Sequence, residues 1–354
     1  MSFNCLLVTH NNIIQCFIEK LRPAAIINGE PQKIRFKNCA ILCLSLDLEN
    51  NQFRIELIFD GLLSNEETKN ISPDRPYYVT SVIKSGDVLF EPIIGDISLL
   101  NILPEDLANL RNKTEKNMIK FYIVRHGQAE HNVSRLRLNM YDTSITNIGR
   151  DQAITSAKAL KKILDRNDET INIVFASDLA RTRQTALPFF NIMFLEPRII
   201  IDPCSNELST NGDGTGNCYE KNAKKIVKAL ENFPNCTPET CRSIKTMSGA
   251  RIAIDWSLYR AFYSSKKNNV RSYSEELKDR PNCKDTNMIA MAVFYLLNID
   301  MAPNVLNVSQ KETIQSGLVE EGISIGGGSR RRKRYTKRHN KKRNNKSKHR
   351  YNYN

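Results

Sequence analysis

Phe121-Tyr-Ile-Val-Arg125-His126-Gly127-Gln128 carries the strongest structural signal in this chain of 354 residues. Four apolar residues in a row predict a buried strand, and the glycine after two polar residues predicts a tight turn. An arginine holds a phosphate through a planar, charge-assisted fork. A histidine beside it can attack phosphorus, because its ordinary pKa leaves it largely neutral at pH 7. The stretch predicts a phosphate-binding strand end, although the same residues also suit an ordinary strand-to-turn junction.

A second strand with a similar ending follows downstream. Residues 142–153 predict a loop and then a helix with Thr146 as its N-cap. Residues 171–176 predict a buried strand, and Ser177 directly after it predicts the N-cap of a helix whose first turn holds Arg181. A helix N-terminus there favours an anion. We therefore expect two strands to bring two arginines to the same edge of one sheet.

These motifs, in this order and spacing, resemble the histidine phosphatase superfamily, which has the phosphoglycerate-mutase-like fold. The resemblance covers about residues 118–210 and includes Thr146, Gly149, Gln152 and Ala153. It implies an α/β fold, a three-layer α/β/α sandwich with a mostly parallel sheet. It also implies a phosphomonoester hydrolase that works through phosphohistidine, with no metal and no cofactor. The roles it implies are nucleophile for His126, phosphate ligands for Arg125, Asn132 and Arg181, and acid and base for Glu207.

The family also has a second histidine, at a strand end well after the acid, and the only histidines after Glu207 are His339 and His349 in a basic tail. Residues 4–21 supply the missing pattern: a strand that ends in Thr-His10, followed by an amphipathic helix, with Asn11 where glycine is more usual. Residues 34–46 and 52–60 then resemble the closing hairpin of the family. We therefore predict a circularly permuted domain in which His10 lies beside His126 on neighbouring parallel strands.

Two other interpretations of residues 1–65 stay open at this point. They could be the tail of an upstream, incomplete copy, or the mark of a rearranged or wrongly assembled gene that no longer folds as one unit. Permutation is tolerated where the chain ends lie close together and a linker can bridge them. The expected organisation is the usual C-terminal half in residues 1–65, a partly structured connector in 66–117, the usual N-terminal half with nucleophile and helical cap in 118–300, and a linker with a disordered basic tail in 301–354.

The net charge of +14 is concentrated in that tail. Residues 330–354 hold thirteen lysines and arginines and no acid, so residues 1–329 carry only +1. The tail follows a Gly-Gly-Gly-Ser hinge, and its composition predicts disorder. Residues 330–350 can bind nucleic acid or another polyanion without sequence preference, or act as a nuclear address. A solubilising tail is the alternative. Such tails resemble those on proteins of large DNA viruses, so a nuclear or viral setting is also an expectation.

The cysteine content and the lengths of the apolar runs bear on the compartment that we expect for this protein. Nine cysteines at irregular spacings predict free thiols in a reducing, intracellular compartment. We find no signal peptide and no apolar run long enough to span a bilayer, so we expect no membrane contact. The expected partner is a phosphorylated small molecule or phosphoprotein, whose identity the sequence leaves open. A mutase-type phosphotransferase and a catalytically inactive relic that binds nucleic acid or a partner through the tail are the alternatives.

Overall fold

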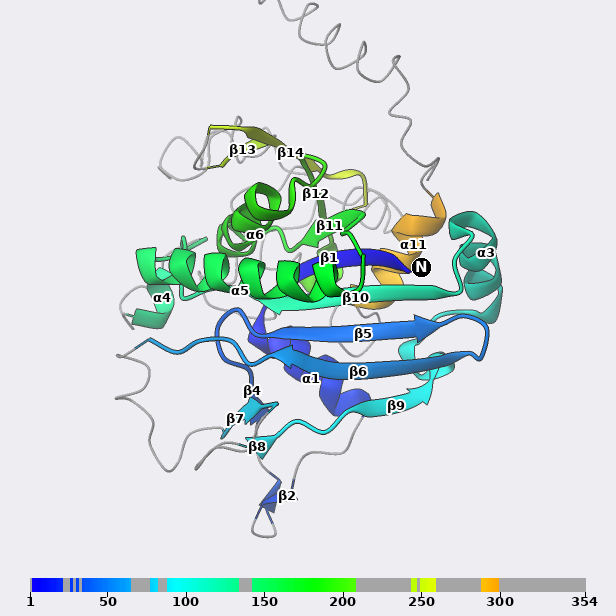
Figure 1. Ribbon diagram of the computed structural model, residues 1–354. Helices are drawn as coiled ribbons and strands as arrows, with labels where there is room; N and C mark the ends of the chain where they lie inside the picture. The colour runs from blue at the N-terminus through cyan, green and yellow to red at the C-terminus, as the bar shows by residue number, and fades with distance from the viewer. Residues whose placement is uncertain are drawn as a thin grey trace, which may run out of the picture. The chain divides into compact units, whose positions relative to one another are not determined.

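Figure 1 shows the computed structural model of the chain. The structure describes residues 2–21, 26–27, 30–31, 34–64, 77–81, 88–133, 142–207, 243–246, 249–258 and 288–298. Met1–Met301 forms one compact unit and Ala302–Asn354 another. The predicted basic tail and most of the predicted helical cap lie outside the described residues, so the predicted division of the chain into four segments stays a prediction.

A nine-stranded sheet occupies the centre of the first unit, in the order β13-β14-β12-β11-β1-β10-β5-β6-β9. Its strands are β1 (Phe3–Thr9), β5 (Ile41–Asp47), β6 (Gln52–Phe59), β9 (Ile93–Asp96), β10 (Met118–Arg125), β11 (Ile173–Ala176), β12 (Arg198–Ile201), β13 (Ser243–Lys245) and β14 (Arg251–Asp255). The five adjacent strands from β14 to β10 are parallel, β6 shares their direction, and β13, β5 and β9 run the opposite way. The predicted mostly parallel sheet is confirmed.

The first strand of the chain lies in the middle of this sheet. β1 pairs in parallel with β10 on one side and with β11 on the other, and Thr9 lies opposite Arg125. Because the carboxyl ends of parallel strands meet at one edge of a sheet, the residues that follow all three strands converge there. The prediction that the first strand lies beside the strand ending at His126 is confirmed.

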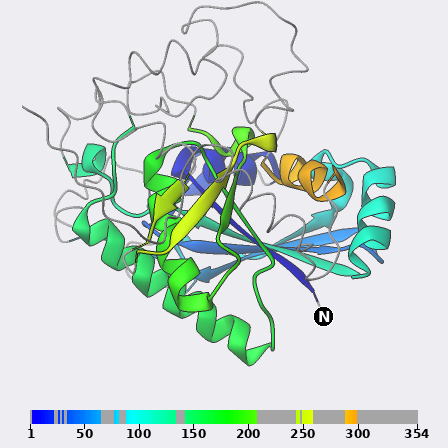
Figure 2. The same cartoon turned by 90° about the horizontal axis from the view of Figure 1, so that it is seen from above.

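Side chains alternate between the two faces of the sheet, and both faces are covered by helices. Leu6 and Val8 belong to an apolar cluster with α5 (Asn147–Arg166) and α6 (Ala180–Met193). Cys5 and Leu7 belong to a second cluster with helices on the other face, which are α1 (Asn11–Leu21), α3 (Pro104–Thr114) and α11 (Met288–Asn298). Figure 2 shows the sheet between these two sets of helices. The fold is therefore the predicted three-layer α/β/α sandwich.

β5 and β6 form the predicted antiparallel hairpin. The Asp47 side chain fixes its turn by accepting hydrogen bonds from the backbone amides of Glu49 and Asn50, both at 3.1 Å. The run that begins at residue 34 is not one strand, because Cys39 has a φ of 57° and the left-handed backbone there separates β4 (Ile34–Arg35) from β5.

Short elements lie before β5 and between β6 and β10. β4, β7 (Tyr77–Thr80) and β8 (Val88–Leu89) form a small sheet, and β2 (Ile26–Ile27) pairs with β3 (Glu30–Pro31). β9 then joins the edge of the main sheet, and a 3₁₀ turn, Ile97–Leu100, leads into α3.

The start of β1 and the end of α11 each lie beside the part of the chain that joins α3 to β10, at the edge opposite the converging strand ends. Phe3, at the start of β1, lies opposite Ile119 near the start of β10. The Lys113 ammonium, in the last turn of α3, donates a 2.7 Å hydrogen bond to the Leu297 carbonyl oxygen at the end of α11. Neighbouring ends of this kind are what a circular permutation requires.

Candidate active site

His126 follows β10 and is buried at the edge where the parallel strands end. Its backbone amide donates to the Thr9 carbonyl oxygen at 2.9 Å, which ties it to the end of β1. Its Nδ1 lies 2.7 Å from the Gly127 carbonyl oxygen. A carbonyl oxygen only accepts hydrogen bonds, so Nδ1 carries the proton and the lone pair is on Nε2. Burial and the charges of Arg181 and Arg125 lower the pKa of His126 well below its ordinary value, which keeps the ring neutral and nucleophilic.

Gly127 and Gly149 allow two backbones to touch behind the nucleophile. A Cβ on Gly127 would lie 2.4 Å from the Gly149 carbonyl oxygen, and a Cβ on Gly149 would lie 2.1 Å from the Gln128 carbonyl oxygen. The predicted Thr146 N-cap is confirmed, because its hydroxyl accepts from the Gly149 amide at 3.0 Å. Both glycines therefore serve the packing of α5 against the strand end.

His10 follows β1 and is fully buried beside His126. The two ring centroids lie 5.1 Å apart, at an interplanar angle of 63°. His10 Nε2 lies 2.8 Å from the Ser177 hydroxyl, and Nδ1 lies 3.5 Å from the Glu207 carboxylate. Desolvation and the charge of Arg181 hold the pKa of His10 well below its usual value. The first strand of the chain thus delivers a neutral imidazole to the edge that holds His126.

Ser177 does not cap the following helix, so that prediction is wrong. α6 begins at Ala180 with Leu179 as N-cap, and its first amide, that of Ala180, donates to the buried Asp142 carboxylate from outside the helix. The Ser177 hydroxyl accepts from the Leu179 amide at 3.1 Å and faces the His10 ring. The two residues before the helix are held in this non-helical turn, which positions Ser177 against His10.

Arg125 is buried and holds the backbone at Phe36 in place. Its guanidinium donates to the Phe36 carbonyl oxygen, and the Phe36 amide donates to the Asn11 side-chain oxygen at 2.9 Å. The unusual Asn11 therefore has a structural use, because it holds the segment that Arg125 also contacts.

Arg181 and Glu207 form an ion pair at this edge of the sheet. Arg181 lies in the first turn of α6, is fully buried, and donates to a Glu207 carboxylate oxygen. The same oxygen faces His10, and the other accepts from the Asn12 amide at 3.2 Å. The carboxylate thus lies between the guanidinium and the imidazole, in a position suited to an anion.

Asn132 is in α4 (Glu130–Val133). Its side-chain oxygen accepts from the Ala129 amide at 2.9 Å, so that oxygen has a local role in the turn. The structure gives no contact between Asn132 and Arg125, His126 or Arg181 within the described residues. Its predicted contact with phosphate stays a prediction.

Sequence reasoning missed His131, the neighbour of Asn132. Its ring centroid lies 5.9 Å from that of His126, and its Nδ1 lies 2.8 Å from the Thr143 hydroxyl. Burial and the charges of Arg181, Arg125 and Arg35 lower its pKa to about 3. The sequence carries only a weak signal for this residue, its position one place before Asn132 in the nucleophile motif.

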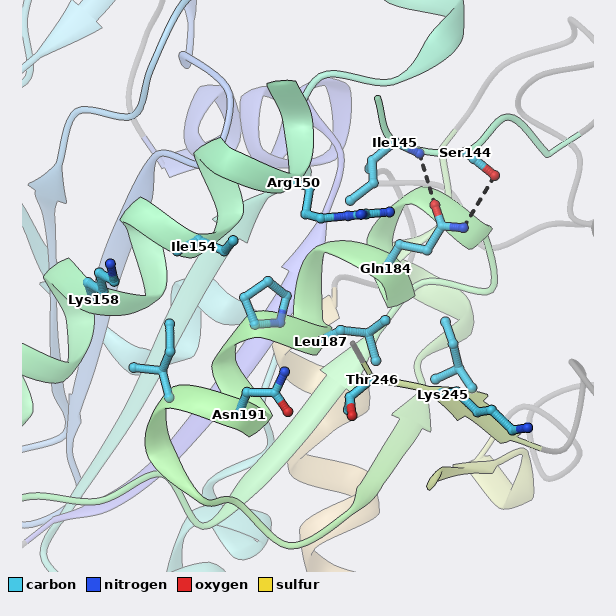
Figure 3. A pocket seen from close by; sticks show the side chains of 13 residues that line it. Ser144, Ile145, Arg150, Ile154, Lys158, Gln184, Leu187, Asn191, Lys245 and Thr246 are labelled. Atoms are coloured by element: carbon cyan, nitrogen blue, oxygen red, sulfur yellow. Dashed lines mark hydrogen bonds between the residues drawn. The ribbon is translucent and has the colours of Figure 1, made fainter. Parts of the chain in front are cut away.

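One cavity in the described part of the chain lies away from the histidines. It has a volume of about 660 Å³ and lies between α5, α6 and β13 (Figure 3). Arg150, Leu187 and Lys245 are among its lining residues, and Gln184 fixes one wall by accepting from the Ile145 amide at 2.9 Å. None of the predicted site residues lines it.

Other site types find no support in the described residues. No group of three or more histidine, cysteine or acidic side chains is arranged to hold a metal ion in that part of the chain. Among the same residues, no helix is long and apolar enough to cross a membrane. The prediction of free thiols is confirmed for the cysteines that the structure describes, which are Cys5, Cys16, Cys39, Cys43 and Cys204.

Comparison with known proteins points to one family. Residues 121–243 match the model of the histidine phosphatase superfamily, branch 1. The chain is 35% identical over 116 residues to the probable phosphoglycerate mutase GpmB of Photorhabdus laumondii. The matched segment covers 31% of this chain and 50% of the relative. It is 38% identical over 71 residues to the broad-specificity phosphatase YOR283W of Saccharomyces cerevisiae, covering 20% of this chain and 29% of the relative.

A third similar protein is phosphoglycerate mutase 3 of Saccharomyces cerevisiae, 37% identical over 73 residues, which is 20% of this chain and 24% of the relative. The chain thus spans half or less of the length of these curated relatives. No solved structure matches it. The segment that matches the family begins at Phe121 and does not include β1 or His10.

Proposed function

Because the chain belongs to the histidine phosphatase superfamily through residues 121–243, we propose that it is a phosphomonoester hydrolase that works through a phosphohistidine. One observation carries this proposal: His126 presents a neutral Nε2 beside the buried Arg125 and Arg181. A nucleophile with a free lone pair and two guanidinium groups matches what phosphoryl transfer needs.

In the proposed first step, His126 Nε2 attacks the phosphorus atom and the ester P–O bond breaks. Arg125 and Arg181 hold the phosphoryl oxygens, and His10 and Asn132 add hydrogen bonds to them. Glu207, in its protonated form, gives its proton to the leaving alkoxide. General acid catalysis of this kind contributes about 10²–10⁴-fold to the rate.

In the proposed second step, water attacks phosphohistidine and the P–N bond breaks. The Glu207 carboxylate takes a proton from the water as its oxygen bonds to phosphorus. The products are an alcohol and inorganic phosphate, and the enzyme returns to its starting state. The short distances from Glu207 to both Arg181 and His10 support this double role, because the carboxylate is already next to the groups that would hold the phosphoryl oxygens.

We further propose that the domain is circularly permuted. Three observations support this: β1 lies between β10 and β11, the end of α11 lies next to the end of α3, and the family match leaves β1 out. A reordered chain that links Asn298 to Phe3 by a flexible linker and begins at Pro104 should fold and keep activity. Loss of folding in that chain, with several linker lengths tried, would count against the permutation.

Phosphate transfer to a second substrate, as in a mutase, is the runner-up, because two of the similar proteins are named as phosphoglycerate mutases. The test is phosphate release from a panel of phosphomonoesters by wild type and by the His126→Ala variant. We expect wild type to release phosphate and the variant to be inactive. Transfer of label to an added alcohol without phosphate release would establish the mutase instead. If neither phosphate release nor transfer of label is detected, the remaining alternative is a non-catalytic binding protein.

We also propose that residues 330–350 contact a polyanion, since thirteen basic residues without an acid fall in residues 330–354. Binding of an arbitrary DNA duplex should then weaken steeply between 50 and 200 mM salt. Equal binding after removal of residues 330–354 would refute this part of the proposal.

A further inference from the structure

The cavity between α5, α6 and β13 has no part in the proposed reaction. Its volume of about 660 Å³ lies within the range of about 300–1,000 Å³ that is usual for small-molecule sites. Apolar side chains from both helices, from β13 and from the segment before α5 line it, and a ligand that covered them would remove their remaining exposed surface from water. The half-buried members of this apolar lining are Ile145, Ile154, Leu187, Ile192 and Ile244.

Three cations line the same cavity, and none of its described lining residues is acidic. They are Arg150 and Lys158 on α5 and Lys245 at the end of β13, and all three are exposed. Among the described residues, no acid forms an ion pair with any of them. The next lysine along α5 differs, because Lys161 pairs with Asp165 at 2.6 Å. The charges at the cavity are therefore available to an anion.

The spacing of the α5 residues brings charge and apolar surface together. Arg150, Ile154 and Lys158 are four residues apart, so they lie on one face of the helix, with the isoleucine between the two cations. Lys245 supplies the third charge from a different element. A ligand on the isoleucine would thus have cations on either side of its apolar part.

The wall of the cavity is fixed by hydrogen bonds. The Gln184 side chain accepts from the Ile145 amide at 2.9 Å and donates to the Ser144 hydroxyl at 3.2 Å, which ties the segment before α5 to α6 (Figure 3). The Ser144 carbonyl oxygen accepts from the Glu130 amide at 3.0 Å. A wall that is already held in place lowers the ordering cost of binding.

We propose that this cavity is a second ligand site, which binds a small amphiphilic anion. The ligand has an aromatic ring or a short acyl chain as its body and carries one acidic group. The body covers the apolar lining, and the acidic group accepts charge-assisted hydrogen bonds from the cations. The site is separate from the phosphoryl centre and does not depend on the proposed reaction.

The experiment compares two dyes that differ in one acidic group. Anilinonaphthalene sulfonate is an apolar ring system with a sulfonate, and phenylnaphthylamine is the same ring system without it. Fluorescence titration gives the affinity of each dye, and the ratio of the two affinities isolates the contribution of the charge. The ratio is measured for wild type, for single glutamine variants of Arg150, Lys158 and Lys245, and for the triple variant. Arg54→Gln is the control, because Arg54 is an exposed arginine on β6.

We expect wild type to bind the sulfonate at one site per chain, and about tenfold more tightly than the neutral dye. Each single variant should lower this ratio by about two- to fivefold, because the charges are exposed and partly screened. The triple variant should bring the ratio close to one, and Arg54→Gln should leave it unchanged.

Two further variants locate the bound dye. Ile154→Trp fills part of the cavity and should weaken both dyes by a similar factor, whereas Ile94→Trp, at an exposed isoleucine on β9, should weaken neither. Arg181→Gln removes a cation of the phosphoryl centre and should leave the ratio unchanged. Partly unfolded chains bind this sulfonate dye, so damage to the fold would raise its binding and cannot imitate the expected losses.

Three results would overturn the proposal. The first is a wild-type ratio near one. The second is a triple variant that keeps the wild-type ratio, or an Ile154→Trp variant that binds both dyes as tightly as wild type. The third is a ratio that falls in Arg181→Gln, which would place the dye at the phosphoryl centre.

Discussion

Replacing Glu207 by glutamine should change ligand binding and turnover in opposite directions. The carboxylate contacts the fully buried Arg181 and lies 3.5 Å from His10. A phosphate or vanadate ion held by those groups would meet the negative charge of Glu207 at close range. Glutamine keeps the shape of the side chain and removes both that charge and the proton that the acid must donate.

The magnitudes follow from the position of the carboxylate. Two unit charges about 4 Å apart interact by about 4 kcal/mol at an effective dielectric constant of 20. The Glu207 side chain is 14% exposed, so solvent screens part of this repulsion, and its loss also removes an attraction to Arg181. We therefore expect vanadate to bind on the order of tenfold more tightly to Glu207→Gln. Turnover should fall by about 10²–10⁴-fold, because general acid and base catalysis is lost.

Calorimetric titration with vanadate measures the affinity, and phosphate release measures turnover. Glu56→Gln is the matched control, because Glu56 is an exposed carboxylate on β6 that pairs with Arg54. It should change neither quantity. Damage to the fold would weaken vanadate binding and turnover together. Weaker binding in Glu207→Gln, or turnover equal to wild type, would refute the assigned role of this carboxylate.

Four further substitutions test the architecture around the site. Gly127→Ala and Gly149→Ala should each destabilise the fold by about 1–3 kcal/mol in urea unfolding, and less than additively together, because both disturb one backbone contact; additive effects would contradict a shared contact. Burial raises the pKa of Asp202 to about 7, so its protonated form stabilises the fold below about pH 4 and this stability is lost as pH rises to about 7. The urea midpoint of wild type should fall between about pH 5 and pH 7.5, and Asp202→Asn should reduce this fall. An equally steep fall in the variant would show that Asp202 does not cause it. Ser177→Ala should lower kcat with little change in KM by removing the 2.8 Å contact to His10, whereas an unchanged kcat would make that contact incidental.

The sequence predicted the parts of this molecule that depend on local pattern. Apolar runs ending in polar residues located β1, β10 and β11, and a threonine three residues before a glycine located the start of α5. The position of His10 beside His126 was also predictable, because two parallel strands with similar endings bring their following residues to one edge.

Features that depend on distant partners could not be read from the pattern. Ser177 has the usual chemistry of an N-cap, but its hydroxyl faces His10, which lies 167 residues earlier in the chain. Gly127 predicted a tight turn, and the pattern gave no sign that the Gly149 backbone would lie where a Gly127 Cβ would be.

The central claim is that the first strand of the chain and residues 125–207 build a single phosphohistidine site, and trapping the phosphoenzyme tests it most directly. Wild type is mixed with a labelled phosphomonoester, quenched in alkali because phosphohistidine is acid-labile, and digested for peptide mapping. Label should appear on the peptide that contains His126, be absent from His126→Ala, and form about 10²–10³-fold more slowly in His10→Ala. Label on another residue, or labelling of His10→Ala at the wild-type rate, would contradict a site that needs the first strand of the chain.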